Sequence, residues 1–284
     1  MNFFQLPRWI EPHLYSKKRF SDFTPDEIEA LRQKLKPFNR PDPEISVIIP
    51  AWNEENNIYR ALSSLAANHP RLPTEIIVVN NNSTDNTQRV LDVLGVKSYV
   101  QTLQGTQHAR QMGLENAKGK YYLCADSDTI YPPDWINCMI EPLVTEKSIS
   151  CVYGNYSFLP PEGQNRLGLA LYELAGEVVI ALRRRQGKEF VNVYGFNMGF
   201  ETRKGLQSGG FIISGSRKYD NIKGSDFVNE SEDGRMALNL MSFGRLHRVT
   251  SKKATVFTSS RRLMDDGSIW KAFLNRFRRQ IRNK

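Results

Sequence analysis

At 284 residues, with 40% hydrophobic and 24% charged residues, the chain has the composition of a soluble globular protein with room for one large core or two coupled lobes. Its formal net charge of +9 favours an anionic partner, such as a phosphorylated small molecule, a nucleic acid or an acidic membrane surface. Three widely spaced cysteines argue against a disulfide framework, and no apolar run is long enough to cross a bilayer. Charged residues interrupt the N-terminal segment before an apolar run long enough for a signal-peptide core, so we expect a cytoplasmic protein.

Residues 1–44 are predicted to form an N-terminal extension. Thr24-Pro-Asp-Glu is a helix-start pattern, and Ile28, Leu31 and Leu35 follow at helical spacing. Prolines at positions 37, 41 and 43 end this helix before the main domain begins.

Strands and helices then alternate along the first half of the main domain. Residues 45–50, 75–79 and 121–125 are apolar runs typical of strands buried on both faces, and residues 96–100 resemble a shorter strand. Helical patterns with short loops separate them, including residues 105–117. The alternation predicts an α/β fold with a mostly parallel, Rossmann-like sheet and helices on both faces.

Polar clusters stand where these strands end. The strand at 121–125 stops at two carboxylates, Asp126 and Asp128, with prolines just behind them. Ligands of open α/β sheets bind at the carboxyl ends of strands, and two converging acids favour a shared divalent cation. The alternative is structural, with Asp126 capping the next helix and Asp128 solvated in a turn.

The second half has a different pattern. We expect a strand over residues 150–158, a partly exposed helix over 167–182 and a glycine-interrupted strand over 191–200. A helix follows Ser231, residues 255–257 form a last strand, and residues 263–284 have the pattern of a basic amphipathic helix.

The motifs at the strand ends, taken in order with Glu232-Asp233, resemble family 2 inverting glycosyltransferases with a GT-A fold. The motifs are Pro-Ala-Trp-Asn-Glu-Glu after the first strand, Asn-Asn-Asn-Ser-Thr-Asp after the second, and Asp126-Ser-Asp. The resemblance runs from about residue 45 to 262. It implies a nucleotide-sugar-binding half at 45–145, a smaller acceptor-binding and catalytic half at 146–262, and sugar transfer from a nucleotide diphosphate to a hydroxyl with Mg²⁺ or Mn²⁺.

The resemblance also implies the donor contacts. Asn81 stands where the family often has an aspartate that accepts from uracil, which leaves the base open although a UDP-sugar is the expected donor. Asp128 would ligate the metal, and Asp126 would face the ribose. The donor-binding residues implied are Pro50, Ala51, Trp52, Glu54, Asn81, Arg110, Asp126, Ser127, Asn197 and Arg261.

On the acceptor side, the resemblance implies that Asp233 is the general base, with Glu232 as its neighbouring competitor. Each assignment has a structural alternative. Helix-start acids are common caps, Arg110 could lie on a solvated helix face, the glycines around Asn197 could serve strand packing, and Arg261 could belong to a surface basic cluster.

Two rival classes remain open: a catalytically inactive nucleotide-sugar-binding protein and a nucleic-acid-binding α/β domain. No nucleic-acid module is recognisable, so we expect no nucleic-acid partner. The acceptor could be a glycan, a lipid-linked molecule or a protein. The basic tail could bind an acidic membrane or pack on the core; its apolar residues are Trp270, Phe273, Leu274, Phe277 and Ile281.

Overall fold

The structure is a computed structural model that describes residues 5–15, 18–161, 165–212 and 231–264. The strands are β1 Ile45–Ala51, β2 Thr74–Asn80, β3 Lys97–Val100, β4 Tyr121–Cys124, β5 Thr129–Ile130, β6 Ile149–Gly154, β7 Tyr156–Leu159, β8 Met198–Glu201, β9 Arg245–Val249 and β10 Val256–Ser259. The helices are α1 Glu11–Leu14, α2 Pro25–Leu35, α3 Ile58–Leu65, α4 Thr87–Leu94, α5 Thr106–Asn116, α6 Trp135–Thr145, α7 Leu167–Arg185, α8 Thr202–Gln207, α9 Glu232–Leu240 and α10 Arg261–Met264. None of these helices is both long and apolar enough to span a bilayer.

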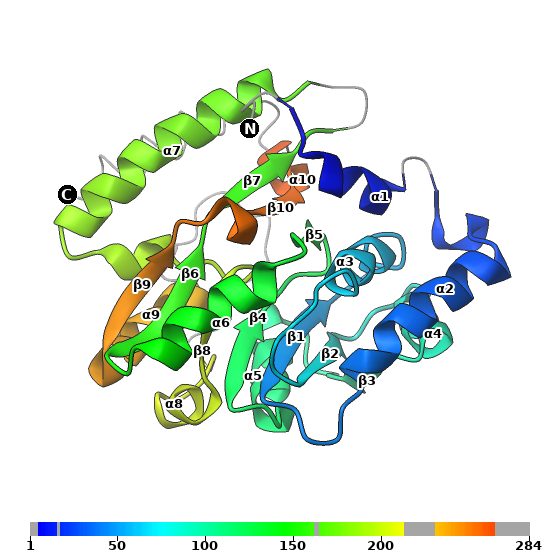
Figure 1. The fold of residues 1–284 in the computed structure, drawn as a ribbon, viewed down its shortest axis with the longest axis horizontal. Coiled ribbons are helices and arrows are strands. Elements are labelled where there is room, and N and C mark those ends of the chain that lie inside the picture. The colour runs from blue at the N-terminus through cyan, green and yellow to red at the C-terminus, as the bar shows by residue number, and fades with distance from the viewer. Residues whose placement is uncertain (1–4, 16–17, 162–164, 213–230, 265–284) are drawn as a thin grey trace.

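A seven-stranded sheet forms the centre of the molecule, in the order β3-β2-β1-β4-β8-β6-β9 (Figure 1). β1 pairs in parallel with β2 and β4, β2 pairs in parallel with β3, and β8 runs antiparallel between β4 and β6. All seven residues of both β1 and β2 are buried, as expected for strands covered on both faces. The predicted α/β class with a mostly parallel sheet is confirmed.

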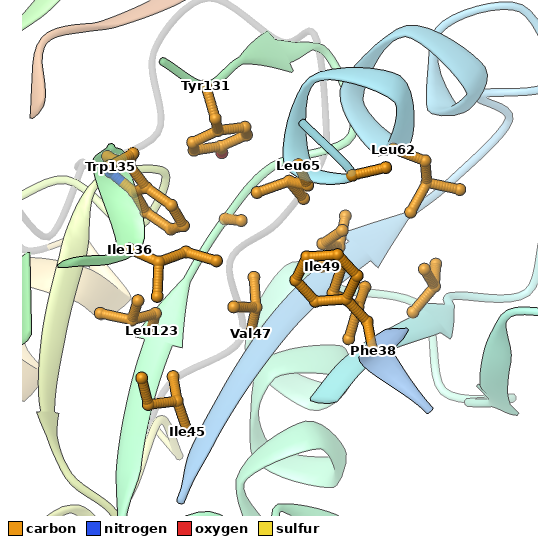
Figure 2. Packing of buried hydrophobic residues seen from close by; sticks show 14 of the residues in the cluster. Phe38, Ile45, Val47, Ile49, Leu62, Leu65, Leu123, Tyr131, Trp135 and Ile136 are labelled. Atoms are coloured by element: carbon orange, nitrogen blue, oxygen red, sulfur yellow. The ribbon is translucent and has the colours of Figure 1, made fainter. Parts of the chain in front are cut away.

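Helices pack on both faces of the sheet. Successive side chains of β1 point to opposite faces, so each face receives part of the core. Val47 and Ile49 belong to a core cluster that includes residues of α3, α4 and α6. Figure 2 shows these two side chains among Leu62, Leu65 and Ile136. Ile48 belongs to the other cluster, which includes residues of α5 and α9. The two helices that carry predicted site residues, α5 and α9, therefore share one face of the sheet.

The N-terminal extension packs on this body. Thr24 caps α2 by accepting a hydrogen bond from the Glu27 backbone, and the Glu27 carboxylate accepts one from the Thr24 backbone. Leu31 and Leu35 are buried in the same core cluster as β1. The predicted helix start at Thr24 is confirmed.

The expected single strand over 150–158 was wrong, because the chain changes sheets at Asn155. β6 lies in the large sheet, whereas β7 joins a second sheet in the order β5-β10-β7. The Asn155 carbonyl accepts from the Val256 backbone, and its side-chain oxygen accepts from Arg248. These partners lie about a hundred residues further along the chain, so the local pattern carries no sign of the break.

The expected strand over 191–200 was wrong except at its end, where β8 forms. Residues Glu189–Asn192 are a 3₁₀ helix, and the Asn197 backbone closes a turn onto the Tyr194 carbonyl. Sequence reasoning also missed β9, because three of its five residues are Arg245, His247 and Arg248. A strand at the edge of a sheet tolerates such polar residues.

Candidate functional site

The carboxyl ends of β1, β2 and β4 meet at one edge of the sheet, as their parallel register requires. Ala51 pairs with Asn80, and the Ala125 backbone extends β4 by donating to the Ile48 carbonyl. Pro50 and Ala51 are buried at this edge, while the next residue, Trp52, is 53% exposed. The polar segments that follow the strands therefore lie together, as the sequence predicts.

A buried arginine joins the first half of the main domain to the second half. Arg110 on α5 is only 2% exposed, and its Nη2 donates to Asp126 Oδ1 at 2.7 Å. Its Nε lies 3.5 Å from Asp233 Oδ1, at the start of α9. Burial alone would lower the pKa of Arg110, but the carboxylates of Asp233 and Asp126 outweigh it and raise that pKa above its usual value. The guanidinium is therefore a fixed positive charge between the two acids.

This bridge depends on a glycine. A Cβ on Gly195 would lie 2.2 Å from Asp233 Oδ1 and 2.4 Å from Arg110 Nη2, so no other residue fits without displacing the ion pair. Arg110 Nε and Nη1 and Asp233 Oδ1 are buried without a hydrogen-bond partner among the described residues. Two of these atoms, Arg110 Nε and Asp233 Oδ1, face each other as the 3.5 Å ion pair. A buried pair with unfilled hydrogen-bonding capacity is one feature of sites that bind a ligand.

Asp233 lies in the first turn of α9, with most of its side chain buried. Ser231 caps α9 by accepting from the Gly234 backbone at 3.1 Å, which places Glu232 and Asp233 in the first turn. Burial, with smaller contributions from the charges of Glu232 and Asp126, raises the pKa of Asp233 to about 6, although Arg110 opposes the shift. Glu232 is buried beside it. Both predicted catalytic acids thus lie at this helix start, and Asp233 is the one that contacts Arg110.

A second cluster surrounds Asp128. Arg261 Nη2 donates to Glu54 Oε1 at 2.8 Å and lies 3.7 Å from Asp128 Oδ2, while Asn57 donates to the other Glu54 oxygen. Asp128 and Arg261 line a pocket of about 390 Å³ together with Asn57 and Arg60. Glu54, Asp128 and Arg261 were all predicted site residues, and the fold brings them together from three separate segments.

Asn81 has both ends of its amide engaged in the structure. Its oxygen accepts from the Gly105 backbone at 2.8 Å, and its nitrogen donates to the Leu103 carbonyl at 2.7 Å. It therefore fastens the loop that leads into α5. The carbonyl oxygen keeps a second lone pair, through which it could still receive a hydrogen bond from a base.

Asn197 lies within the fold and not on a cleft. It is 1% exposed, accepts from Trp135 Nε1 at 2.8 Å, and donates to the carbonyls of Asn155 and Ala254. Ser127, between the two acids, is buried as well. The role that the resemblance implied for Asn197, a donor contact, has no support in these contacts.

Replacing Asn197 by alanine should lower the free energy of unfolding by about 2–3 kcal/mol, because Trp135 Nε1 and two carbonyls would lose partners in the interior. Chemical denaturation measures the change. Asn137→Ala is the matched control, since its bonds are exposed. Equal stability of Asn197→Ala and the unchanged protein would contradict the structural role.

Sequence reasoning missed Tyr131 as a support of the site. Its hydroxyl accepts from the Asp126 backbone at 2.7 Å and donates to the Phe196 carbonyl at 3.2 Å. It thereby ties the acidic turn to the segment that contains Gly195. In the sequence Tyr131 stands next to two prolines, and this local pattern indicates no more than an ordinary core residue.

Comparison with known proteins gives a match to a family model described as glycosyl transferase family 2, over residues 46–202. A hyaluronan synthase of Pasteurella multocida is 30% identical over 152 residues, which are 50% of this chain and 15% of that protein. The dolichol-phosphate mannosyltransferase of Saccharomyces cerevisiae is 35% identical over 109 residues, covering 35% of this chain and 41% of that one. The matches span less than half the length of both relatives.

Among solved structures, glucosyl-3-phosphoglycerate synthase from Mycobacterium tuberculosis, in complex with Mn²⁺, UDP-glucose and phosphoglyceric acid, has a TM-score of 0.49 and 21% identity. The alignment covers 81% of this chain and 74% of that one.

Proposed function

Because the chain belongs to glycosyl transferase family 2, we propose that it transfers a sugar from a nucleotide-diphosphate donor to an acceptor hydroxyl with inversion. The observation that carries this proposal is the buried Asp126–Arg110–Asp233 bridge. In this bridge the Arg110 guanidinium pairs both with the Asp126 carboxylate at the strand ends and with the Asp233 carboxylate, whose pKa is raised. A reaction that brings a donor and an acceptor together needs these two groups in one place.

The donor would lie along the strand ends. Trp52, which is 53% exposed beside the buried Pro50 and Ala51, offers an apolar surface for a base. Asp126 keeps one carboxylate oxygen for a ribose because Arg110 engages the other. In this arrangement Arg110 acts on the donor through Asp126. A UDP-sugar is the donor we propose.

The residues around Asp128 fit a divalent ion carried in with the donor. Among the described residues, no group of three or more histidine, cysteine or acidic side chains is arranged to hold a metal ion, so the protein alone would not supply a full set of ligands there. Mg²⁺ and Mn²⁺ sites of this kind use one or two carboxylates, with phosphate oxygens and water completing the shell. Asp128 would supply the carboxylate, and the bound ion would stabilise the charge of the departing diphosphate. Arg261, 3.7 Å from Asp128, would contact the same phosphates.

Asp233 would remove the proton of the acceptor hydroxyl as that oxygen attacks the anomeric carbon. A single displacement from the face opposite the diphosphate inverts the anomeric configuration and requires no nucleophile from the protein. Arg110 holds the carboxylate in position and Gly195 leaves room for it. Glu232 is the competing base, but it makes no ion pair with Arg110 among the described contacts.

The pH dependence of turnover should reflect Asp233. Because its pKa is raised to about 6, turnover should fall tenfold per pH unit below that value, whereas an ordinary aspartate would remain a base down to about pH 4. In Arg110→Gln the fall in turnover should begin at a higher pH, since the cation lowers the pKa of Asp233. Initial rates at saturating donor between pH 5 and 8 measure this pH in the unchanged protein and in the variant. The same pH in both would contradict the electrostatic link.

Thermal unfolding with UDP-, GDP- and CDP-sugars, each with and without Mn²⁺, tests the function. We expect one nucleotide to raise the unfolding temperature, and only in the presence of the metal. Slow release of the nucleoside diphosphate by hydrolysis would support a transferase. Binding without any release would favour an inactive nucleotide-sugar-binding protein, and stabilisation by oligonucleotides alone would overturn the proposal.

A further inference from the structure

The outward face of α7 is apolar. This helix of 19 residues buries only Leu169 and Ala170. Five large aliphatic side chains recur every three or four residues and are between 46% and 60% exposed: Leu167, Leu171, Leu174, Val178 and Leu182. Side chains at that spacing share one side of a helix, so they form a continuous apolar stripe.

Glu173 and Glu177 lie on the opposite side of α7, together with Tyr172 and Ile180. Beneath the helix is a cavity of about 340 Å³ to which Glu173 and Glu177 contribute. Glu173 pairs with Arg166 at 2.8 Å, and Glu177 pairs with Arg248 at 2.5 Å. A helix exposed to water normally presents polar residues outward, whereas the outward side of α7 is aliphatic. An exposed apolar stripe of this kind indicates an interaction surface.

Positive charge borders the stripe at one end. The last turn of α7 is Arg183, Arg184 and Arg185, of which the last two are exposed, and Lys188 follows. Both carboxylates of the helix are already paired. A surface that covers α7 would contact aliphatic side chains along the helix and positive charge at its C-terminal end, where Arg184 also pairs with Glu189 at 3.1 Å.

We propose that α7 docks on an anionic lipid surface, with the stripe among the acyl chains and the arginines at the headgroups. An aliphatic face together with basic residues is the composition of helices that lie in the membrane interface. α7 does not meet the length and hydropathy needed to cross a bilayer, so it would lie along the surface. A second copy of the chain fits less well, because α7 offers no unpaired carboxylate to the arginines of a partner.

The position of α7 suits this role. It runs along the side of the molecule toward which the arrowheads of β6 and β7 point (Figure 1). β7 leads into the pocket that Asp128 and Arg261 line, through Leu159 and Pro160. Docking through α7 would therefore bring that side of the protein close to the membrane.

Flotation of the full chain with vesicles tests the proposal. We expect binding to vesicles of phosphatidylcholine with about 30% phosphatidylglycerol, and weaker binding to pure phosphatidylcholine or at high salt. Leu174→Glu combined with Val178→Glu should reduce partitioning by about tenfold or more, since two apolar contacts become charged. Arg184→Gln with Arg185→Gln should weaken binding to anionic vesicles only.

The controls separate lipid docking from its alternatives. Leu206→Glu on α8 changes an equally exposed leucine, 47% accessible, and should leave vesicle binding unchanged. Thermal unfolding should show that the double glutamate variant remains folded, because neither side chain is buried. Equal flotation of that variant and the unchanged chain would overturn the proposal. So would a dimer, measured by light scattering without lipid, that the same variant dissociates, because a second copy would then cover the stripe.

Discussion

Replacing Asp233 by asparagine should reduce turnover by about 10²–10⁴-fold, because the amide keeps the shape of the side chain and cannot accept the acceptor's proton. Donor affinity should change little, since Asp233 lies on the acceptor side of Arg110. Steady-state rates with saturating donor measure the loss, and calorimetric titration of the nucleotide measures the affinity.

Glu232→Gln is the matched variant for this test, because Glu232 occupies the neighbouring position in the same helix turn. It should lose less turnover than Asp233→Asn. The opposite order would assign the base to Glu232. A product that retains the donor's anomeric configuration, determined by nuclear magnetic resonance, would rule out the single displacement.

Replacing Asp128 by alanine should abolish metal-dependent binding of the nucleoside diphosphate. The described residues around the pocket offer few carboxylates, and Glu54 already pairs with Arg261 and Asn57. Without Asp128, the divalent ion would lose its carboxylate ligand, and the negative charge of the phosphates would no longer be neutralised at this position. Calorimetric titration of UDP with and without Mn²⁺ measures the effect.

Asp134→Ala is the control for this variant. Asp134 lies a few residues further along, and its carboxylate forms an exposed ion pair with Lys253 at 2.9 Å. Its loss should leave metal-dependent binding intact. If Asp128→Ala bound UDP with unchanged affinity in the presence of Mn²⁺, the metal would have to be held elsewhere.

The strands of the donor half could be predicted because their signal is local. β1 and β2 are buried along their whole length, so they appear in the sequence as unbroken apolar runs. Parallel pairing then brings their carboxyl ends together without further information. The same reasoning failed at β9, since the polar residues of an edge strand resemble those of a loop.

The roles of individual polar side chains could not be predicted in this way. An arginine in the middle of α5 resembles a solvated residue, and its burial depends on Asp126 and Asp233, the latter more than a hundred residues away. Asn197 was predicted to contact the donor because Gly195-Phe-Asn-Met-Gly resembles the segment that lines the donor sugar in the family. Its amide is occupied by Trp135, Asn155 and Ala254, which come from three different parts of the chain.

The sequence alone determined the fold class, the strand ends that form the candidate site, and the helix start that presents Glu232 and Asp233. Apolar periodicity and capping depend on neighbours within a few residues, so one segment contains the whole signal. Only the tertiary structure decided that Arg110 joins the two halves, that the chain changes sheets at Asn155, and that the apolar side of α7 faces outward. Each of these depends on contacts between distant segments, whose geometry exists only after the chain has folded.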